Sequence, residues 1–178
     1  MFKRLPPLVG VPLRYGIIGG VAGFVCLIAL YYMNWHPFLV PVFFDFRIVL
    51  FSVFVVFSLR ELREYFFEGL LFFWQGMIAS FLFTFVFATI VSVLLLILTY
   101  LQPEFVTSFI NLSLEQVKTY TTEDISRIGK ENFELGIKSL QEADGVFMAK
   151  RYFFQCFIIS FFISIIISVI LRRQPKTL

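Results

Sequence analysis

The chain has 178 residues, of which 59% are hydrophobic, 20% are aromatic and only 15% are charged. A soluble domain carries about 25% charged residues, and a water-soluble fold of this length could not bury so many apolar side chains. The composition therefore excludes a soluble globular protein and predicts an integral membrane protein. The net charge of +3 is too small to indicate a nucleic-acid partner.

Apolar runs predict an all-α integral membrane protein with four transmembrane helices. Each run is close to or above the roughly 20 residues that cross about 30 Å of hydrocarbon. The first run is too long for a cleavable signal peptide, so we expect it to act as its own targeting signal. The third run is longer than one upright span needs. The predicted spans are 15–33, 41–59, 74–101 and 152–171.

A dense group of charges, SLRELREYFFEG at 58–69, lies between the second and third spans. Glu64, Glu68 and Gln75 have helical spacing and would share one face, while aromatic residues occupy most of the remainder. This pattern is typical of an amphipathic helix lying in the membrane interface. We therefore predict a cytoplasmic interfacial helix over 60–75, in which Arg60 and Glu64 can form an ion pair.

The positions of Lys and Arg predict the orientation of the chain. In a four-span arrangement, eight Lys and Arg residues lie in the short segments on the same side of the membrane. The positive-inside rule assigns this side to the cytoplasm. Both termini are then cytoplasmic. These residues are Lys3, Arg4, Arg14, Arg60, Arg63, Arg172, Arg173 and Lys176.

The segment 102–151 is then periplasmic and is the only part outside the spans that could form a domain. Pro103 precedes one amphipathic pattern, and residues 121–124 read as a break followed by a new helix N-cap. A second amphipathic pattern follows, and it could continue into the fourth span. We predict a two-helix periplasmic hairpin.

Small residues at helical spacing mark the faces where spans should pack closely. The serine and threonine hydroxyls could instead line a pathway for a polar solute, but bonding back to the carbonyl one turn earlier is the plainer interpretation. Asp45 and Arg47 are placed at the outer end of the second span, and no ionisable residue is expected deep in a span. The predicted packing residues are Gly16, Gly20, Gly23, Ser80, Thr84, Ala88, Ser160, Ser164 and Ser168.

The sequence contains no recognisable catalytic, cofactor-binding or metal-binding pattern, so we predict a protein that is not an enzyme. The single histidine, His36, follows Trp35 and is expected to be an interfacial anchor, because no second histidine or cysteine cluster could complete a metal site. Cys26 and Cys156 both lie in apolar runs and are expected to be small buried thiols. A disulfide between them is conceivable but has no support in the sequence.

Four short motifs resemble a bacterial membrane family known only as domain of unknown function 4199. They are RYG at 14–16, FEGLLFFWQGMIAS at 67–80, QPEFV at 102–106 and ISVILRRQP at 167–175. The resemblance covers nearly the whole chain. It implies four spans and the inner membrane of a Gram-negative bacterium, and it implies no activity, cofactor or catalytic residue.

These observations favour a non-enzymatic accessory or structural subunit of an inner-membrane complex, in contact with membrane lipids and with other membrane-protein subunits. Two alternatives remain: a helper or anchor for glycosyl transfer from polyprenyl-phosphate lipids, and a small transporter or channel. The charged segment is the expected docking surface for a partner. Its candidate contact residues are Arg60, Arg63, Glu64, Glu68 and Trp74.

Overall fold

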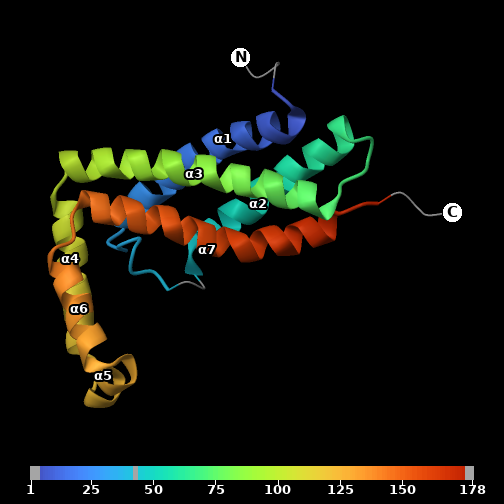
Figure 1. The fold of residues 1–178 in the computed structure, drawn as a ribbon. Helices are drawn as coiled ribbons and strands as arrows, with labels where there is room; N and C mark the ends of the chain where they lie inside the picture. Colours follow the sequence, from blue (N-terminus) through green and yellow to red (C-terminus); the bar gives the residue numbers. More distant parts are fainter. Residues whose placement is uncertain (1–4, 42–43, 175–178) are drawn as a thin grey trace.

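The computed structural model describes residues 5–41 and 44–174, and it is all-helical as predicted (Figure 1). The long helices form a bundle, and three shorter helices form an arm that projects from one end of it. The elements are α1 (Pro7–Tyr32), α2 (Phe46–Glu61), the π-helical turn η3 (Leu62–Phe66), α3 (Phe73–Leu101), α4 (Glu104–Lys118), α5 (Thr122–Ile128), α6 (Lys130–Gln141) and α7 (Gly145–Leu171).

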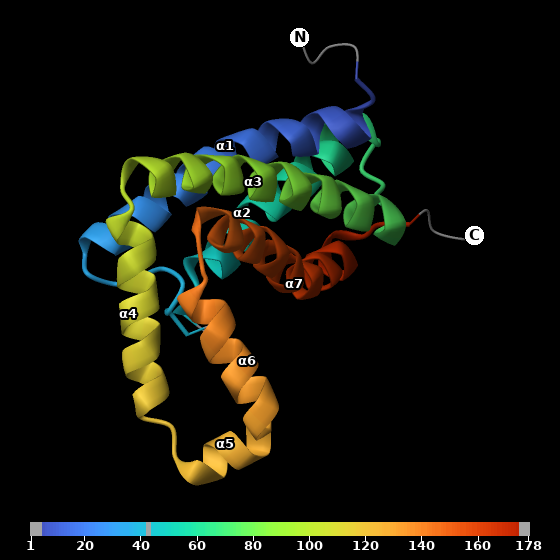
Figure 2. The same ribbon diagram turned by 60° about the vertical axis from the view of Figure 1, so that its left-hand side comes forward.

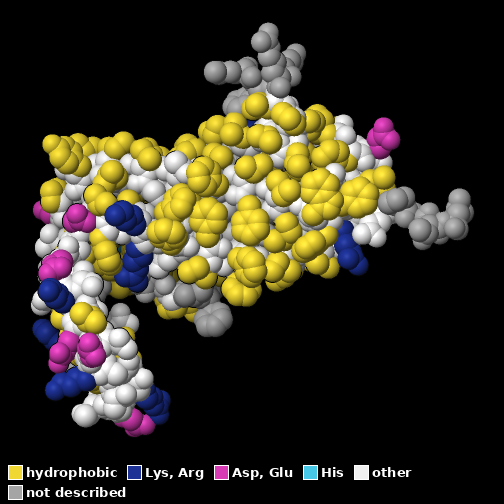
Figure 3. Space-filling view, in the orientation of Figure 1, with side chains coloured by type: hydrophobic (Ala, Val, Ile, Leu, Met, Phe, Trp, Pro, Cys, Tyr) yellow, Lys and Arg dark blue, Asp and Glu magenta, His cyan; other side chains and the backbone are white. Residues whose placement is uncertain are grey.

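Three helices, α1, α3 and α7, are long and apolar enough to cross a membrane. Apolar side chains cover the visible face of the bundle, as expected for a protein embedded in lipid (Figure 3). The predicted second span corresponds to α2, which has 16 residues and is shorter than the roughly 20 that a span needs. The first and last helices begin earlier than the predicted spans. Helix α1 begins at Pro7, and proline is favoured in the first turn of a helix. Helix α7 begins at Gly145, after the Asp144 side chain that caps it.

Phenylalanine rings fill the centre of the bundle. Phe51 of α2 is fully buried against α3, with its ring centroid 4.8 Å from that of Phe87 and 5.8 Å from that of Phe83. Both pairs meet edge to face, a geometry that the aromatic quadrupole favours. Since lipid is as apolar as these side chains, close packing rather than removal from water holds such a core together.

Glycine and hydroxyl residues form the seams between the helices. At Gly16 of α1 an added Cβ would lie 2.8 Å from the Val86 Cβ of α3, and at Gly23 it would lie 2.5 Å from the Phe87 ring. Gly20 packs in the same way on Ile90. Between α3 and α7, Thr84 and Ser160 are hydrogen-bonded, and Ala88 is fully buried. Gly16, Gly20 and Gly23 thus lie at the α1–α3 contact, and Thr84 and Ser160 lie at the α3–α7 contact.

The predicted helix over 60–75 is wrong, because the structure divides this segment. Regular helix ends at Glu61, and the π-helical turn ends at Phe66. Glu68 and Gly69 then have φ values of 51° and 82°, a left-handed backbone that cannot continue a right-handed helix. Leu71 next pairs with Arg173 through two backbone hydrogen bonds of 2.9 Å, so the turn contacts the C-terminal end of α7 before α3 begins.

The segment predicted as a two-helix hairpin contains three helices (Figure 2). Helices α4 and α6 form the two sides of this hairpin, and α5 forms its tip. Gly129, with φ of 89°, separates α5 from α6, which is why the second predicted helix is broken. Helix α6 ends at Gln141, and Asp144 then starts α7. Helix α6 is therefore not continuous with the last span.

We predict that Gly16→Leu lowers the thermal stability of the purified protein in detergent. The added side chain would meet the Val86 Cβ and the Phe83 carbonyl oxygen, and overpacking of this kind costs about 1–3 kcal/mol. Reaction of a thiol-specific dye with the fully buried Cys156 can report unfolding. The control is Gly136→Ala in α6, where no atom lies within 4 Å of an added Cβ; equal melting shifts in both variants would contradict the seam.

Candidate functional site: a buried ion pair and a histidine joint

An ion pair is buried at the start of α2. The Asp45 carboxylate caps the helix by accepting a hydrogen bond of 2.9 Å from the Arg47 backbone N–H. The same carboxylate accepts bonds of 2.8 and 2.9 Å from the Arg47 Nε and a further contact from Nη2. Only 7% of Asp45 and 5% of Arg47 remain exposed. The two charges are thus held together with almost no water around them.

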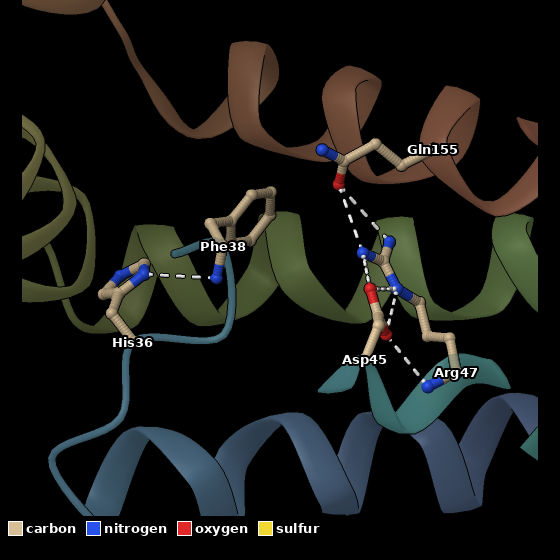
Figure 4. Close-up of polar contacts among 5 residues, drawn as sticks. All are labelled: His36, Phe38, Asp45, Arg47 and Gln155. Carbon is tan, nitrogen blue, oxygen red and sulfur yellow. Dashed lines mark hydrogen bonds and ion pairs between the residues drawn. The ribbon is translucent and has the colours of Figure 1, made fainter. Parts of the chain in front are cut away.

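Helix α7 completes the surroundings of this pair (Figure 4). The Gln155 Oε1 accepts hydrogen bonds of 3.4 and 3.3 Å from the Arg47 Nη1 and Nη2. The Arg47 guanidinium also lies 4.8 Å from the centre of the Tyr152 ring, which is itself buried. Arg47 and Gln155 are 108 residues apart in the sequence, so their contact directly links α2 with α7.

The geometry of this ion pair suits a structural joint more than a reaction centre. Charged residues inside membrane segments are costly and usually mark functional sites, but here each charge is neutralised by its own neighbour in the chain. The sequence predicts Asp45 and Arg47 at the outer end of the second span, and the structure has them at the start of α2, where their side chains are buried. The spacing Asp-x-Arg at a helix start was visible in the sequence, whereas its burial depends on α7.

His36 forms a second joint, between the α1–α2 connection and α4. Its Nδ1 accepts a hydrogen bond of 3.4 Å from the Phe38 N–H, and its Nε2 lies 3.2 Å from the Phe105 carbonyl oxygen. Its ring centroid is 4.8 Å from that of Phe105 and 5.5 Å from that of Phe109. The two bonds require the neutral imidazole with its proton on Nε2. Burial lowers the pKa of His36, because desolvation disfavours the charged ring.

His36 was expected to anchor the chain at the membrane interface together with Trp35. The structure separates the two residues, since Trp35 is 64% exposed and His36 is 6% exposed. The histidine instead contacts the base of the projecting hairpin. The sequence could not identify this contact, because Phe105 is 69 residues away in the chain.

The charged segment binds the helix ends of its own chain. Glu61 accepts hydrogen bonds of 2.5 and 2.6 Å from Arg14 and one of 2.9 Å from the Tyr15 hydroxyl, which ties α2 to α1. Arg63 donates to the Leu171 carbonyl oxygen at 3.4 Å, which ties η3 to α7. Glu64 is paired with Arg63 and Arg60, and the Arg63 hydrogen bond lowers its pKa.

Of the five candidate docking residues, three are therefore engaged within the molecule. Arg60, Arg63 and Glu64 form the contacts just described. Glu68 and Trp74 face outward, and Trp74 is 54% exposed. A partner could reach the last two without breaking an internal bond.

The hydroxyl groups of α3 and α7 bond mainly to protein. Ser80 donates to the Gly76 carbonyl oxygen at 2.8 Å and Thr84 to that of Ser80 at 2.9 Å, the one-turn pattern of helix packing. Ser160 contacts both Thr84 and Ser164. The Ser168 Oγ is buried without a partner among the described residues. These bonds use the hydroxyls for contacts within α3 and between α3 and α7.

Two further possibilities are a disulfide bond and a metal site. Cys26 and Cys156 are free thiols. Across residues 5–41 and 44–174, no group of three or more His, Cys, Asp or Glu side chains could hold a metal ion.

Comparison with known proteins gives one match. A family model described as "Protein of unknown function (DUF4199)" matches residues 14–173. No curated protein and no solved structure matches the chain.

We predict that Asp45→Ala destabilises the protein by about 3–5 kcal/mol, because it leaves the Arg47 charge buried and unpaired. The double variant Asp45→Asn/Arg47→Met should recover most of this loss, since Asn keeps a helix cap and Met removes the unpaired charge. Thermal unfolding of both variants in detergent measures the difference. If the double variant is no more stable than Asp45→Ala, the cost does not come from the stranded charge.

We predict that acidification loosens the contact between His36 and α4. Since the folded-state pKa lies below the ordinary value of about 6.5, the unfolded form binds more protons as the pH falls. The free energy of unfolding is therefore highest above about pH 6.5 and declines below it until the folded-state pKa is passed.

Hydrogen exchange of the α4 amides, corrected for the intrinsic effect of pH, measures this change. His36→Gln is the matched control, because its amide can accept from the Phe38 N–H and donate to the Phe105 carbonyl without titrating. The same loss of protection in both proteins would exclude His36 as the cause.

Proposed function

The chain belongs to the DUF4199 family, and we propose that it is a non-enzymatic accessory subunit of a protein complex in the inner membrane of a Gram-negative bacterium. The observation that carries this proposal is the projecting hairpin. The hairpin projects away from the bundle (Figure 2), and its helices α5 and α6 contain no buried residue.

A hairpin without a core of its own gains stability by covering its apolar side chains with a partner. Helices in water are held mainly by packing of an amphipathic face, and here contact between α4 and α6 leaves several apolar side chains uncovered. The exposed apolar residues of the hairpin are Leu112, Tyr120, Ile128 and Leu135. They provide a contact surface for the extramembrane part of another subunit.

The charge of the hairpin favours a protein partner over the membrane surface. Residues 121–144 contain three Lys and Arg and six Asp and Glu, and the visible charges gather on the hairpin (Figure 3). An excess of carboxylates is repelled by anionic lipid headgroups. A subunit with complementary charge is the better fit.

We propose four spans with both termini in the cytoplasm. The second span would be the apolar run 41–59, most of which is formed by α2, and the charged residues of η3 would lie beyond its cytoplasmic end. The end of the bundle assigned to the cytoplasm carries Arg14, Arg60, Arg63, Arg172 and Arg173, in agreement with the positive-inside rule. Lys3, Arg4 and Lys176, which belong to the same predicted group, lie outside the described residues. The hairpin is then periplasmic.

We move the proposed docking surface from the charged segment at 58–69 to the hairpin. Arg60, Arg63 and Glu64 join the helix ends within the molecule, so their first role is to fix the bundle. We propose the hairpin as the main docking site, with Glu68 and Trp74 as an additional contact on the cytoplasmic side.

The test is photo-crosslinking in native membranes, with a photoreactive amino acid placed at Leu135 or Ile128. We expect both positions to capture the same protein, and that protein to co-purify in stoichiometric amount in mild detergent. A photoreactive group at Phe85, an exposed residue of α3, should not capture it.

Two variants separate docking from folding. Leu135→Arg should reduce the amount of co-purified partner by at least about tenfold. It should leave the melting temperature unchanged, because Leu135 is 55% exposed. Arg60→Ala/Arg63→Ala/Glu64→Ala should lower the melting temperature and retain the partner. Recovery of only the free protein or self-oligomers from all samples would refute the subunit proposal.

A further inference from the structure

Arg151 is a partly buried cation with which no carboxylate of the described residues forms an ion pair. It lies near the start of α7, and its guanidinium is 5.4 Å from the centre of the Phe109 ring of α4. The ion pairs and side-chain hydrogen bonds found in residues 5–41 and 44–174 do not include it. A desolvated charge without a counter-charge is costly, so its surroundings point to an anion supplied from outside the chain.

The nearby carboxylates are already used. Asp45 is occupied by the side chain and backbone of Arg47, and Arg47 itself repels the Arg151 charge. The Asp144 side chain accepts the Phe147 N–H at 2.7 Å as the cap of α7. The neighbouring residue Lys150 is exposed and adds a second positive charge. Neither carboxylate forms an ion pair with Arg151.

The position of Arg151 along α7 indicates which anion is available. Residues 152–171 are the apolar run that follows it, and 20 helical residues measure about 30 Å, the thickness of the hydrocarbon layer. Arg151 therefore lies at the boundary of that layer. Phosphate groups of lipids lie at this depth, and long basic side chains extend toward them.

We propose that Arg151, assisted by Lys150, binds the phosphate group of an anionic phospholipid in the outer leaflet of the membrane. The planar guanidinium suits phosphate because two parallel N–H groups can donate to two phosphate oxygens. The Phe109 ring orients the face of the guanidinium and leaves donor groups at its edge for the lipid. The bound lipid would also support the base of the hairpin, since Phe109 belongs to α4.

This inference rests on the membrane placement proposed above and is independent of the partner subunit. The test uses the purified full chain without a partner. Delipidated protein in detergent is titrated with phosphatidylglycerol, and bound lipid is counted by native mass spectrometry, with phosphatidylcholine as the zwitterionic comparison. We expect Arg151→Gln to weaken phosphatidylglycerol binding by at least about tenfold and to change phosphatidylcholine binding little.

Arg172→Gln is the matched control, because Arg172 is an exposed arginine at the opposite end of α7; it should leave phosphatidylglycerol binding unchanged. Arg151→Lys keeps the charge but loses the pair of parallel donors, so it should bind phosphatidylglycerol more weakly than the wild type and more tightly than Arg151→Gln. If Arg151→Gln lowers the melting temperature, Arg151→Lys still tests the proposal, since a folded lysine variant that loses the lipid as fully as the glutamine variant would overturn it.

Excess inorganic phosphate distinguishes the two sources of the anion. Retention of phosphatidylglycerol in its presence supports a lipid site, whereas displacement of the lipid would show a site for free phosphate and overturn the proposal. Unchanged phosphatidylglycerol binding in Arg151→Gln would also overturn it. Neither result affects the crosslinking test of the hairpin, so the two proposals fail separately.

Discussion

A polar group that is shielded from water is costly unless another polar group pairs with it, and this constraint shapes the main polar contacts of the bundle. The Asp45–Arg47 pair follows from this constraint, because the carboxylate both caps α2 and neutralises the arginine. Gln155 then uses the remaining guanidinium donors. The same constraint explains the back-bonded hydroxyls of α3.

Close packing is the second requirement of the bundle, since apolar burial drives helices together only weakly in lipid. The seam between α1 and α3 depends on glycines that accept neighbouring side chains at Cβ distance. The seam between α3 and α7 depends on small hydroxyl residues. Large rings such as Phe51 and Phe87 then fill the space at the centre.

The bundle and the hairpin differ in how they are stabilised, and the joint between them connects both parts. Phe105 and Phe109 at the base of α4 are buried, whereas α5 and α6 have no buried residue. His36 and Arg151 contact this base from the α1–α2 connection and from α7. The protein therefore combines a closely packed bundle with a hairpin whose position depends on a few polar and aromatic contacts.

The sequence by itself determined the membrane class and the helical fold, because apolar runs and helical periodicity are local properties of the chain. It also determined the family. Only the tertiary structure decided that Asp45 and Arg47 are buried against α7, that His36 contacts Phe105 and that the segment 60–75 turns back to pair with Arg173. These features join residues far apart in the sequence, and local periodicity carries no information about which distant side chains will satisfy a buried polar group.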